Sequence, residues 1–284
     1  MDFSFTPEQE DLRREARSFL EANPAPTMDQ LADLGWVGML RGGEASFLDA
    51  AVLFEELGRV LYEGPFVLNE VAGQPDEDVW SIEIDGFVPH LDDVDRVLTP
   101  DMKGMTAAGE VLVTVDETLG LGRLSPNGAE PAAGEWADVR RRLLAALALE
   151  AVGIGAKTLE LAIDYTKERE QFGRKIGAYQ AVSHSLVDAY VAVELARSLA
   201  YWSAWCVAEQ DDQVDVAVVA AKSQAVEAAV SACERSIQAH GGIGFTWEHP
   251  LHRYYKRALW LEGALGYGRE HRAEVAQFLL GGQP

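Results

Sequence analysis

The sequence predicts a mainly α protein with an N-terminal helical domain, a short β unit in the middle and a C-terminal four-helix bundle. Three observations predict this order. Apolar side chains recur at helical spacing in residues 1–73, short runs alternate between apolar and polar residues in 74–130, and long helical patterns fill 131–284. Long helices joined by short loops pack as antiparallel bundles, so we expect three domains with these bounds.

The first helix has a clear start. Thr6 suits the N-cap position, Pro7 suits the first helical position, and Gln9 completes a capping box. We expect this helix to end at about residue 21, shortly before Pro24, because the residue before a proline disfavours helix. Three further helical segments are predicted at residues 28–34, 46–58 and 65–72.

The middle of the chain has a different pattern. Residues 80–84, 94–98 and 111–115 alternate between apolar and polar side chains, which predicts three short strands. Turns rich in Gly and Asp separate these runs, and the many acidic side chains of this unit are expected to lie in water.

Five helices are expected after residue 131. The first spans about 132–168 and has one apolar face, formed by Leu159, Ala162, Ile163 and Thr166. The others are predicted at 180–209, 215–240, 249–261 and 264–280.

Composition excludes several classes of function. The net charge is −22, with 46 acidic against 24 basic residues, so binding to nucleic acid or to an anionic membrane is not expected. The two cysteines lie in helical patterns and are expected to be buried free thiols, and no His/Cys cluster has the spacing of a metal site. The N-terminus lacks the features of a signal peptide, and no apolar run approaches about 18 residues, so we expect a cytoplasmic protein without a transmembrane helix.

The sequence R-E-Q-F-G-R-K-I-G, residues 169–177, follows the first bundle helix. Gly173 and Gly177 can end or bend a helix, because glycine tolerates positive φ. On charge alone, the segment is also compatible with a capped helix end whose charges are solvated. Its order, with Gln180 included, closely resembles the R-x-x-F-G-x-x-I-x-x-x-Q signature of acyl-CoA dehydrogenases. The resemblance implies that Arg169, Gln171 and Phe172 reach across a subunit interface to a neighbour's FAD.

A second motif, Q-A-H-G-G-I-G-F, occupies residues 238–245. Three glycines in four positions let a backbone approach a ligand closely, although a glycine-rich loop without a ligand has the same composition. The pattern resembles the second signature of the family, which implies that Gln238, Gly241, Gly242 and Gly244 clasp the adenosine diphosphate part of that FAD. The N-terminal pieces F-T-x-E-Q, LGW-G and EELGR also resemble the family, so the likeness extends over nearly the whole chain.

The chain departs from the family in its middle unit. Members carry a β domain of roughly a hundred residues with a T-E-P-x-A-G-S-D-like segment beneath the flavin ring, and this sequence contains no such segment. The β unit is therefore a truncated one, and the part that would hold the isoalloxazine is missing.

The family's reaction, α,β-dehydrogenation of an acyl-CoA thioester, needs a carboxylate base in an apolar pocket. In many members the base lies twenty positions after the Phe of G-G-x-G-F, which in this chain is Leu265. Glu262 lies three residues earlier and is the nearest candidate, although Leu261-Glu262-Gly263 is also compatible with an accidental match. A second family position falls near Arg140–Arg142, where no carboxylate is present.

Together these features predict one subunit of a heteromeric acyl-CoA dehydrogenase resembling the α2β2 enzymes of actinobacterial steroid or lipid catabolism. A paralogous subunit would supply the flavin-ring pocket and the base, an acyl-CoA would be the substrate, and an electron-transfer flavoprotein or a similar protein would accept electrons. Two alternatives remain open. One is a self-sufficient homo-oligomeric dehydrogenase with Glu262 as base, and the other is a non-catalytic scaffold subunit.

Overall fold

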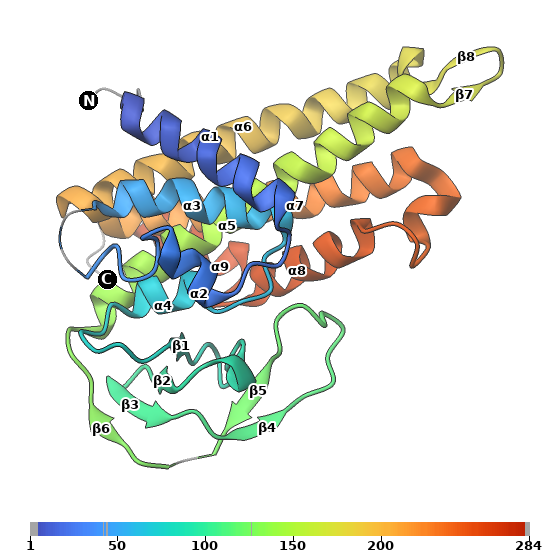
Figure 1. Ribbon diagram of the computed structural model, residues 1–284. Coiled ribbons are helices and arrows are strands. Elements are labelled where there is room, and N and C mark those ends of the chain that lie inside the picture. The colour runs from blue at the N-terminus through green and yellow to red at the C-terminus, as the bar shows by residue number, and fades with distance from the viewer. Residues whose placement is uncertain (1–4, 42, 44, 126, 282–284) are drawn as a thin grey trace.

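The computed structural model describes residues 5–41, 43, 45–125 and 127–281. The first four residues, which belong to the segment considered for a signal peptide, lie outside this part. Figure 1 shows the helices stacked together, with the β unit packed below them and joined to them by two chain crossings. The mainly α fold with a small middle β unit is therefore confirmed.

Four helices form the N-terminal part: α1 (Pro7–Ala22), α2 (Met28–Asp33), α3 (Phe47–Val60) and α4 (Phe66–Ala72). The predicted capping box is present, since Gln9 N donates to Thr6 Oγ1 over 3.2 Å and Thr6 N donates to Gln9 Oε1 over 3.1 Å. Thr27 and Ser46 begin α2 and α3 in the same way. Side chains at the N-cap thus set three of these helix starts.

The C-terminal part contains α5 (Trp136–Glu168), α6 (Gln180–Glu209), α7 (Val214–His240), α8 (Leu251–Gly263) and α9 (Gly268–Leu279). The bounds predicted for the second and third of these helices are confirmed to within one residue. α5 is the central helix, because it packs against α3, α6, α7 and α8 and is almost continuously buried from residue 143 to 155. The main hydrophobic core surrounds it.

Helix α7, continued by the turn of residues 241–245, is long and apolar enough to cross a membrane by length and composition. However, 67% of its apolar window is buried inside the fold. Its composition is therefore that of a core helix packed between α5, α6 and α9.

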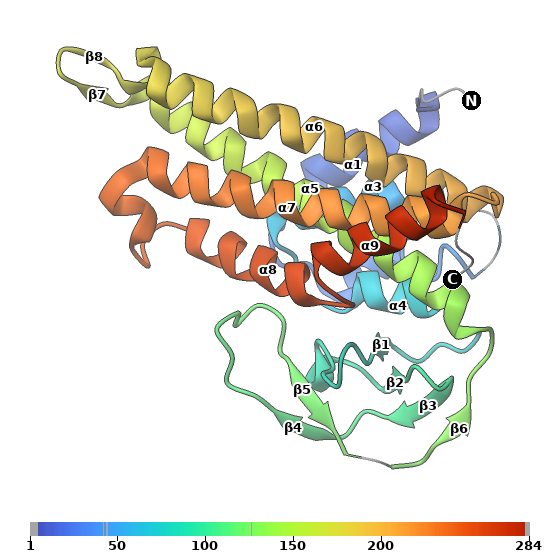
Figure 2. The same ribbon diagram turned by 180° about the vertical axis from the view of Figure 1, so that it is seen from behind.

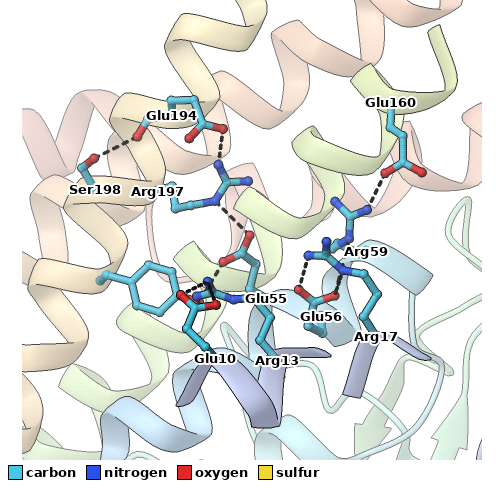
Figure 3. A network of polar contacts seen from close by, with 11 residues as sticks. Glu10, Arg13, Arg17, Glu55, Glu56, Arg59, Glu160, Glu194, Arg197 and Ser198 are labelled. Carbon is cyan, nitrogen blue, oxygen red and sulfur yellow. Dashed lines mark hydrogen bonds and ion pairs between the residues drawn. The ribbon is translucent and has the colours of Figure 1, made fainter. Parts of the chain in front are cut away.

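Two adjacent glutamates of α3 link the N-terminal helices to the bundle (Figure 3). Glu55 accepts hydrogen bonds from Arg197 Nε over 2.9 Å and from Tyr201 Oη over 2.8 Å, both on α6. Glu56 accepts from Arg17 of α1 over 2.6 and 2.9 Å. Because both carboxylates are almost fully buried, each needs these donors, and the donors fix α1 and α6 against α3.

The β unit contains two small sheets. β1 (Trp80–Ile82) pairs in parallel with β2 (Arg96–Leu98), and the sheet continues antiparallel through β3 (Lys103–Thr106) to β6 (Glu130–Pro131). β4 (Gly109–Val111) and β5 (Gly122–Leu124) form the second sheet. The strands predicted at 80–84 and 94–98 are thus confirmed as β1 and β2.

The strand predicted at residues 111–115 is wrong. Only Val111 lies in a strand, while Val113 and Val115 are exposed, so the alternation buries no apolar face. The chain leaves the sheet after Val111 and turns inward, where Asp116 meets Arg257 of α8 over 3.0 Å. A buried ion pair therefore determines the path of this segment.

Candidate cofactor-binding site

Residues 170–175 form a two-stranded β-hairpin, with β7 (Glu170–Gln171) paired to β8 (Arg174–Lys175). Phe172 (φ 52°) and Gly173 (φ 80°) form its two-residue turn, and positive φ at both positions is the geometry of a type I′ turn. Neither glycine ends α5, as the sequence had suggested, because the helix already stops at Glu168 and Arg169 is extended. Figure 1 shows the hairpin projecting beyond the bundle, away from the β unit.

Contacts within the segment fix the hairpin. Tyr179 Oη donates to Gln171 O over 3.2 Å, and the Arg174 guanidinium lies 3.8 Å from the centre of the Tyr179 ring. Lys175 Nζ donates to the last carbonyl of α5, that of Glu168, over 2.8 Å. By contrast, the Arg169 side chain is exposed and makes no hydrogen bond or ion pair with any residue that the structure describes. Arg169 is therefore available to an external anion.

The glycine motif forms η3 (Gly241–Phe245) between α7 and α8. Gly241 needs its left-handed φ of 63° to leave α7, and a Cβ at Gly244 would lie 2.6 Å from the carbonyl oxygen of Ile237. Gly242 differs, because its φ is not positive and a Cβ there would meet nothing within 4 Å. The fold of this chain explains glycine at 241 and 244 but not at 242.

An aromatic stack joins the two motifs. The ring of Tyr165, in the last turn of α5, stacks on His240 at 4.4 Å, and His240 lies 4.4 Å from the ring of His249. Burial, together with the neighbouring His240 and His252, lowers the pKa of His249 and so favours its neutral form. The structure thus brings both predicted motifs to one end of the bundle.

The predicted binding residues at this end face outward. Arg169, Gln171, Phe172, Gln238 and Gly242 are all exposed, and Phe172 is 94% exposed. Phe245 and Trp247, beside the glycine loop, are each 74% exposed. The unpaired Arg169 guanidinium, exposed aromatic rings such as that of Phe172, and an open glycine backbone fit the phosphates and flat rings of a dinucleotide such as FAD. We name the hairpin and η3 together the clamp.

Comparison with known proteins places the chain in a family. A family model described as acyl-CoA dehydrogenase, C-terminal domain, matches residues 141–280. Acyl-CoA dehydrogenase IpdE2 of Mycobacterium tuberculosis is 33% identical over 243 residues, which cover 77% of this chain and 74% of that protein. The chain belongs to the acyl-CoA dehydrogenase family. FAD is the cofactor of this family, as the sequence motifs predicted.

Solved structures share the acyl-CoA dehydrogenase fold along the whole chain. A variant of the Tcur3481-Tcur3483 steroid ACAD has a TM-score of 0.81 at 22% identity, covering 96% of this chain and 98% of that one. The ChsE4-ChsE5 complex from Mycobacterium tuberculosis has a TM-score of 0.80 at 21% identity, covering 100% of both chains. The predicted acyl-CoA dehydrogenase-like fold is therefore confirmed.

Glu262, the candidate base, lies in the last turn of α8. It lines an open cleft with Ser223, Tyr267 and Arg272, and Arg272 Nη1 donates to Glu227 there over 2.9 Å. This polar cleft differs from the apolar pocket that an acyl-CoA dehydrogenase base requires. Helix α8 begins at Leu251, next to the clamp, and Glu262 lies eleven residues further along it. At a rise of 1.5 Å per residue, Glu262 is about 17 Å along the helix from the clamp. Its role as a base stays a prediction.

Two buried cations were missed by the sequence analysis. Arg257 of α8 is 2% exposed and donates to Asp116, Thr118 and Glu150. Lys222 of α7 is 0% exposed and donates to the carbonyls of Leu261 and Ala264 over 2.6 and 3.0 Å, which holds the C-terminal end of α8. Burial lowers the pKa of Lys222 to about 8. The sequence did contain a signal for Lys222, because a lysine within the Ala- and Val-rich pattern of α7 indicates a buried cation.

Proposed function

We propose that this chain is one subunit of a heteromeric FAD-dependent acyl-CoA dehydrogenase and that it supplies the clamp to an FAD held by a paralogous partner. One observation carries the proposal. The hairpin of the clamp is exposed and projects away from the β unit of its own chain, so the cofactor that it would contact lies on a neighbouring molecule (Figures 1 and 2). The ChsE4-ChsE5 complex, whose fold this chain shares, is a precedent for an assembly of two differently named chains.

Each clamp residue has a distinct role in this proposal. Arg169 binds the pyrophosphate as a cation, Phe172 covers a flat part of the cofactor, and Gly242 lets the loop backbone approach the adenosine diphosphate. Gln171 and Gln238 can donate amide hydrogen bonds, while Gly241 and Gly244 keep the loop in shape. When bound, FAD supplies the two-electron acceptor for α,β-dehydrogenation of an acyl-CoA thioester.

The interior of this chain supports assigning the base to the partner. Glu150 of α5 is the buried carboxylate facing the cavity between the bundle and the β unit, and Arg257 holds it as an ion pair. That cavity has a volume of about 20 Å³, room for about one water molecule. We infer that the acyl group is bound mainly by the partner, that an electron-transfer flavoprotein or similar protein reoxidises the cofactor, and that the complex is cytoplasmic.

The decisive experiment is the flavin absorbance of the chain purified alone and after co-expression with its paralogue. We expect a colourless lone chain and a complex that holds FAD at half the number of chains. In the complex, Arg169→Ala should lower FAD content several-fold, because the guanidinium contributes a charge-assisted contact. Lys167→Ala removes an exposed cation two residues earlier, in the last turn of α5, and should not lower it.

Two results would favour the alternatives. A lone chain that is yellow near stoichiometry and dehydrogenates an acyl-CoA would carry a complete site, and Glu262 would become the leading base. If the FAD content and the activity of the complex are unchanged in Arg169→Ala, the chain acts as a non-catalytic scaffold.

A further inference from the structure

Helix α9 packs on the bundle through a face that is half polar. Its inward side chains are spaced three and four residues apart, and they are His271, Glu274, Val275 and Phe278. His271 is the one buried residue of this helix, with 1% of its surface exposed, while the other three are half-buried. Figure 2 shows α9 on the outer surface of the bundle, where it packs on α7. A histidine thus occupies the anchoring position that an apolar side chain usually fills in an amphipathic helix.

The imidazole of His271 has weak polar contacts. Both ring nitrogens are buried, and neither makes a hydrogen bond with a residue that the structure describes. Glu274 Oε1 lies 3.5 Å from Nδ1 of His271, and Glu274 Oε2 lies 3.5 Å from Nη2 of Arg140 on α5. One glutamate is therefore shared between the histidine and an arginine.

Two cations around His271 oppose its protonation. Lys222 of α7 is fully buried and donates to two backbone carbonyls, and with a pKa of about 8 it stays largely protonated at pH 7.5 and below. Arg140 adds a second positive charge. Burial, followed by the Lys222 charge, lowers the pKa of His271, while Glu274 acts in the opposite direction.

The other acidic side chains near this site are directed elsewhere. Glu270 Oε2 accepts from the Tyr267 amide over 2.8 Å at the start of α9. The acids that face Lys222 or the outer side of α9 come from the β unit, α7 and α8, and they are Asp85, Glu227 and Glu262. A second proton on the imidazole would therefore meet one shared carboxylate and two cations.

We propose that His271 is a proton-sensitive anchor: its neutral imidazole holds α9 against α7, and its protonation releases α9 from the bundle. A buried positive charge beside Lys222 and Arg140 is less favourable than the same charge in water, so the proton binds more readily when the helix is released. Packing of α9 is complete above the ordinary histidine pKa of about 6.5, and it weakens as the pH falls from there toward the lower pKa of the packed ring.

Release of α9 has a structural consequence for the cleft that contains Glu262. One wall of that cleft is formed by the start of α9 and the residue before it, namely Tyr267, Gly268, Arg269 and Arg272. The cleft therefore opens when the helix leaves α7.

The test compares hydrogen exchange at pH 7.5 and pH 5.5 in the full chain, in the assembly in which it purifies. Mass spectrometry gives the protection of the amides in residues 268–279, corrected for the chemical exchange rate at each pH. We expect this protection to fall several-fold at pH 5.5, up to a limit of about tenfold set by a released imidazole with a pKa of about 6.5. The buried middle of α5 should stay far more protected than α9 at both pH values.

The variants separate the titration of His271 from its packing. His271→Leu and His271→Gln do not titrate, so the protection of α9 should be nearly the same at both pH values. Val275→Ala, on the same face, should lower the protection by one factor at both pH values and keep the wild-type ratio between them. His184→Gln, which replaces an exposed histidine of α6, should behave as the wild type.

Four results would overturn the proposal. The first is equal protection of wild-type α9 at both pH values, and the second is a wild-type pH ratio in both His271 variants. Protection of α9 that falls to the same level as that of α5 at pH 5.5 would mean global unfolding instead of helix release. Loss of protection at pH 7.5 in both His271 variants would mean that the shape of the ring, not its charge state, holds α9.

Discussion

Arg257 and Glu150 form an ion pair inside the protein, with Nη1 donating to Oε1 over 2.6 Å. The same guanidinium donates through Nε to Asp116 over 3.0 Å, so one cation joins α8, α5 and the loop between β4 and β5. All three side chains are at least nine-tenths buried. Two carboxylates therefore depend on one partner for their neutralisation.

Replacing Arg257 should destabilise the fold strongly. Arg257→Met leaves Glu150 and Asp116 buried without a counter-charge, and we expect the free energy of unfolding to fall by about 3–5 kcal/mol. Urea denaturation followed by circular dichroism measures the change. Lys167→Met, which removes an exposed cation 3.9 Å from Asp164, is the control and should cost less than about 1 kcal/mol. A loss equally small for Arg257→Met would mean that water already solvates the two carboxylates.

The two glycines of η3 should respond in opposite ways. Gly244→Ala forces a Cβ against the carbonyl of Ile237, so we expect a loss of about 1–3 kcal/mol in stability. Gly242→Ala meets only open space and should change stability by less than about 0.5 kcal/mol, while lowering the FAD content of the complex. Thermal unfolding and flavin absorbance separate the two effects. Full FAD content in Gly242→Ala would remove this loop from the cofactor contact.

His90 should make stability depend on pH. Burial, with a smaller effect of the Arg257 charge, lowers its pKa to about 3. Because the folded pKa lies below the unfolded value of about 6.5, the unfolded chain binds the proton first, and stability falls as pH decreases from 6.5 toward 3. At pH 5, His90 alone should cost about 2 kcal/mol relative to pH 7.

Asparagine is the suitable control at this position, since His90 has a φ of 56° and asparagine tolerates the left-handed region. The difference in unfolding free energy between pH 7 and pH 5 should be smaller in His90→Asn by the stated amount. Groups that titrate elsewhere in the protein cancel in this comparison. An identical pH dependence in both proteins would show that folding does not lower the pKa of His90, so that the folded and unfolded chains bind its proton equally well.

Replacing Glu262 tests where the base lies. If the partner supplies it, Glu262→Gln should leave the turnover of the complex within about twofold of the wild type, because the carboxylate takes no part in proton transfer. Steady-state dehydrogenation of an acyl-CoA with an artificial electron acceptor measures this. Turnover abolished while FAD content is kept would instead identify Glu262 as the base.

Local signals were sufficient to predict most of the helices. The capping box of Thr6 and Gln9 and the apolar periodicity of α6 and α7 depend on neighbours within a few residues, and all appear as expected. The hairpin at 170–175 was missed, since strands of two residues contain no alternating pattern. Both family motifs could be located from sequence, but their meeting depends on the contact between Tyr165 and His240, 75 positions apart. The Arg257–Asp116 pair, 141 positions apart, also leaves no local trace.

The type I′ turn at Phe172 and Gly173 has a consequence for assembly. Its two-residue loop is closed by paired strands and by the Tyr179 hydroxyl, so the tip of the hairpin is already ordered before any partner arrives. Ordering a flexible loop on association costs conformational entropy, and a preorganised tip avoids that cost. Recognition at this tip should therefore proceed as rigid docking, with little change in backbone dynamics when the neighbouring chain binds.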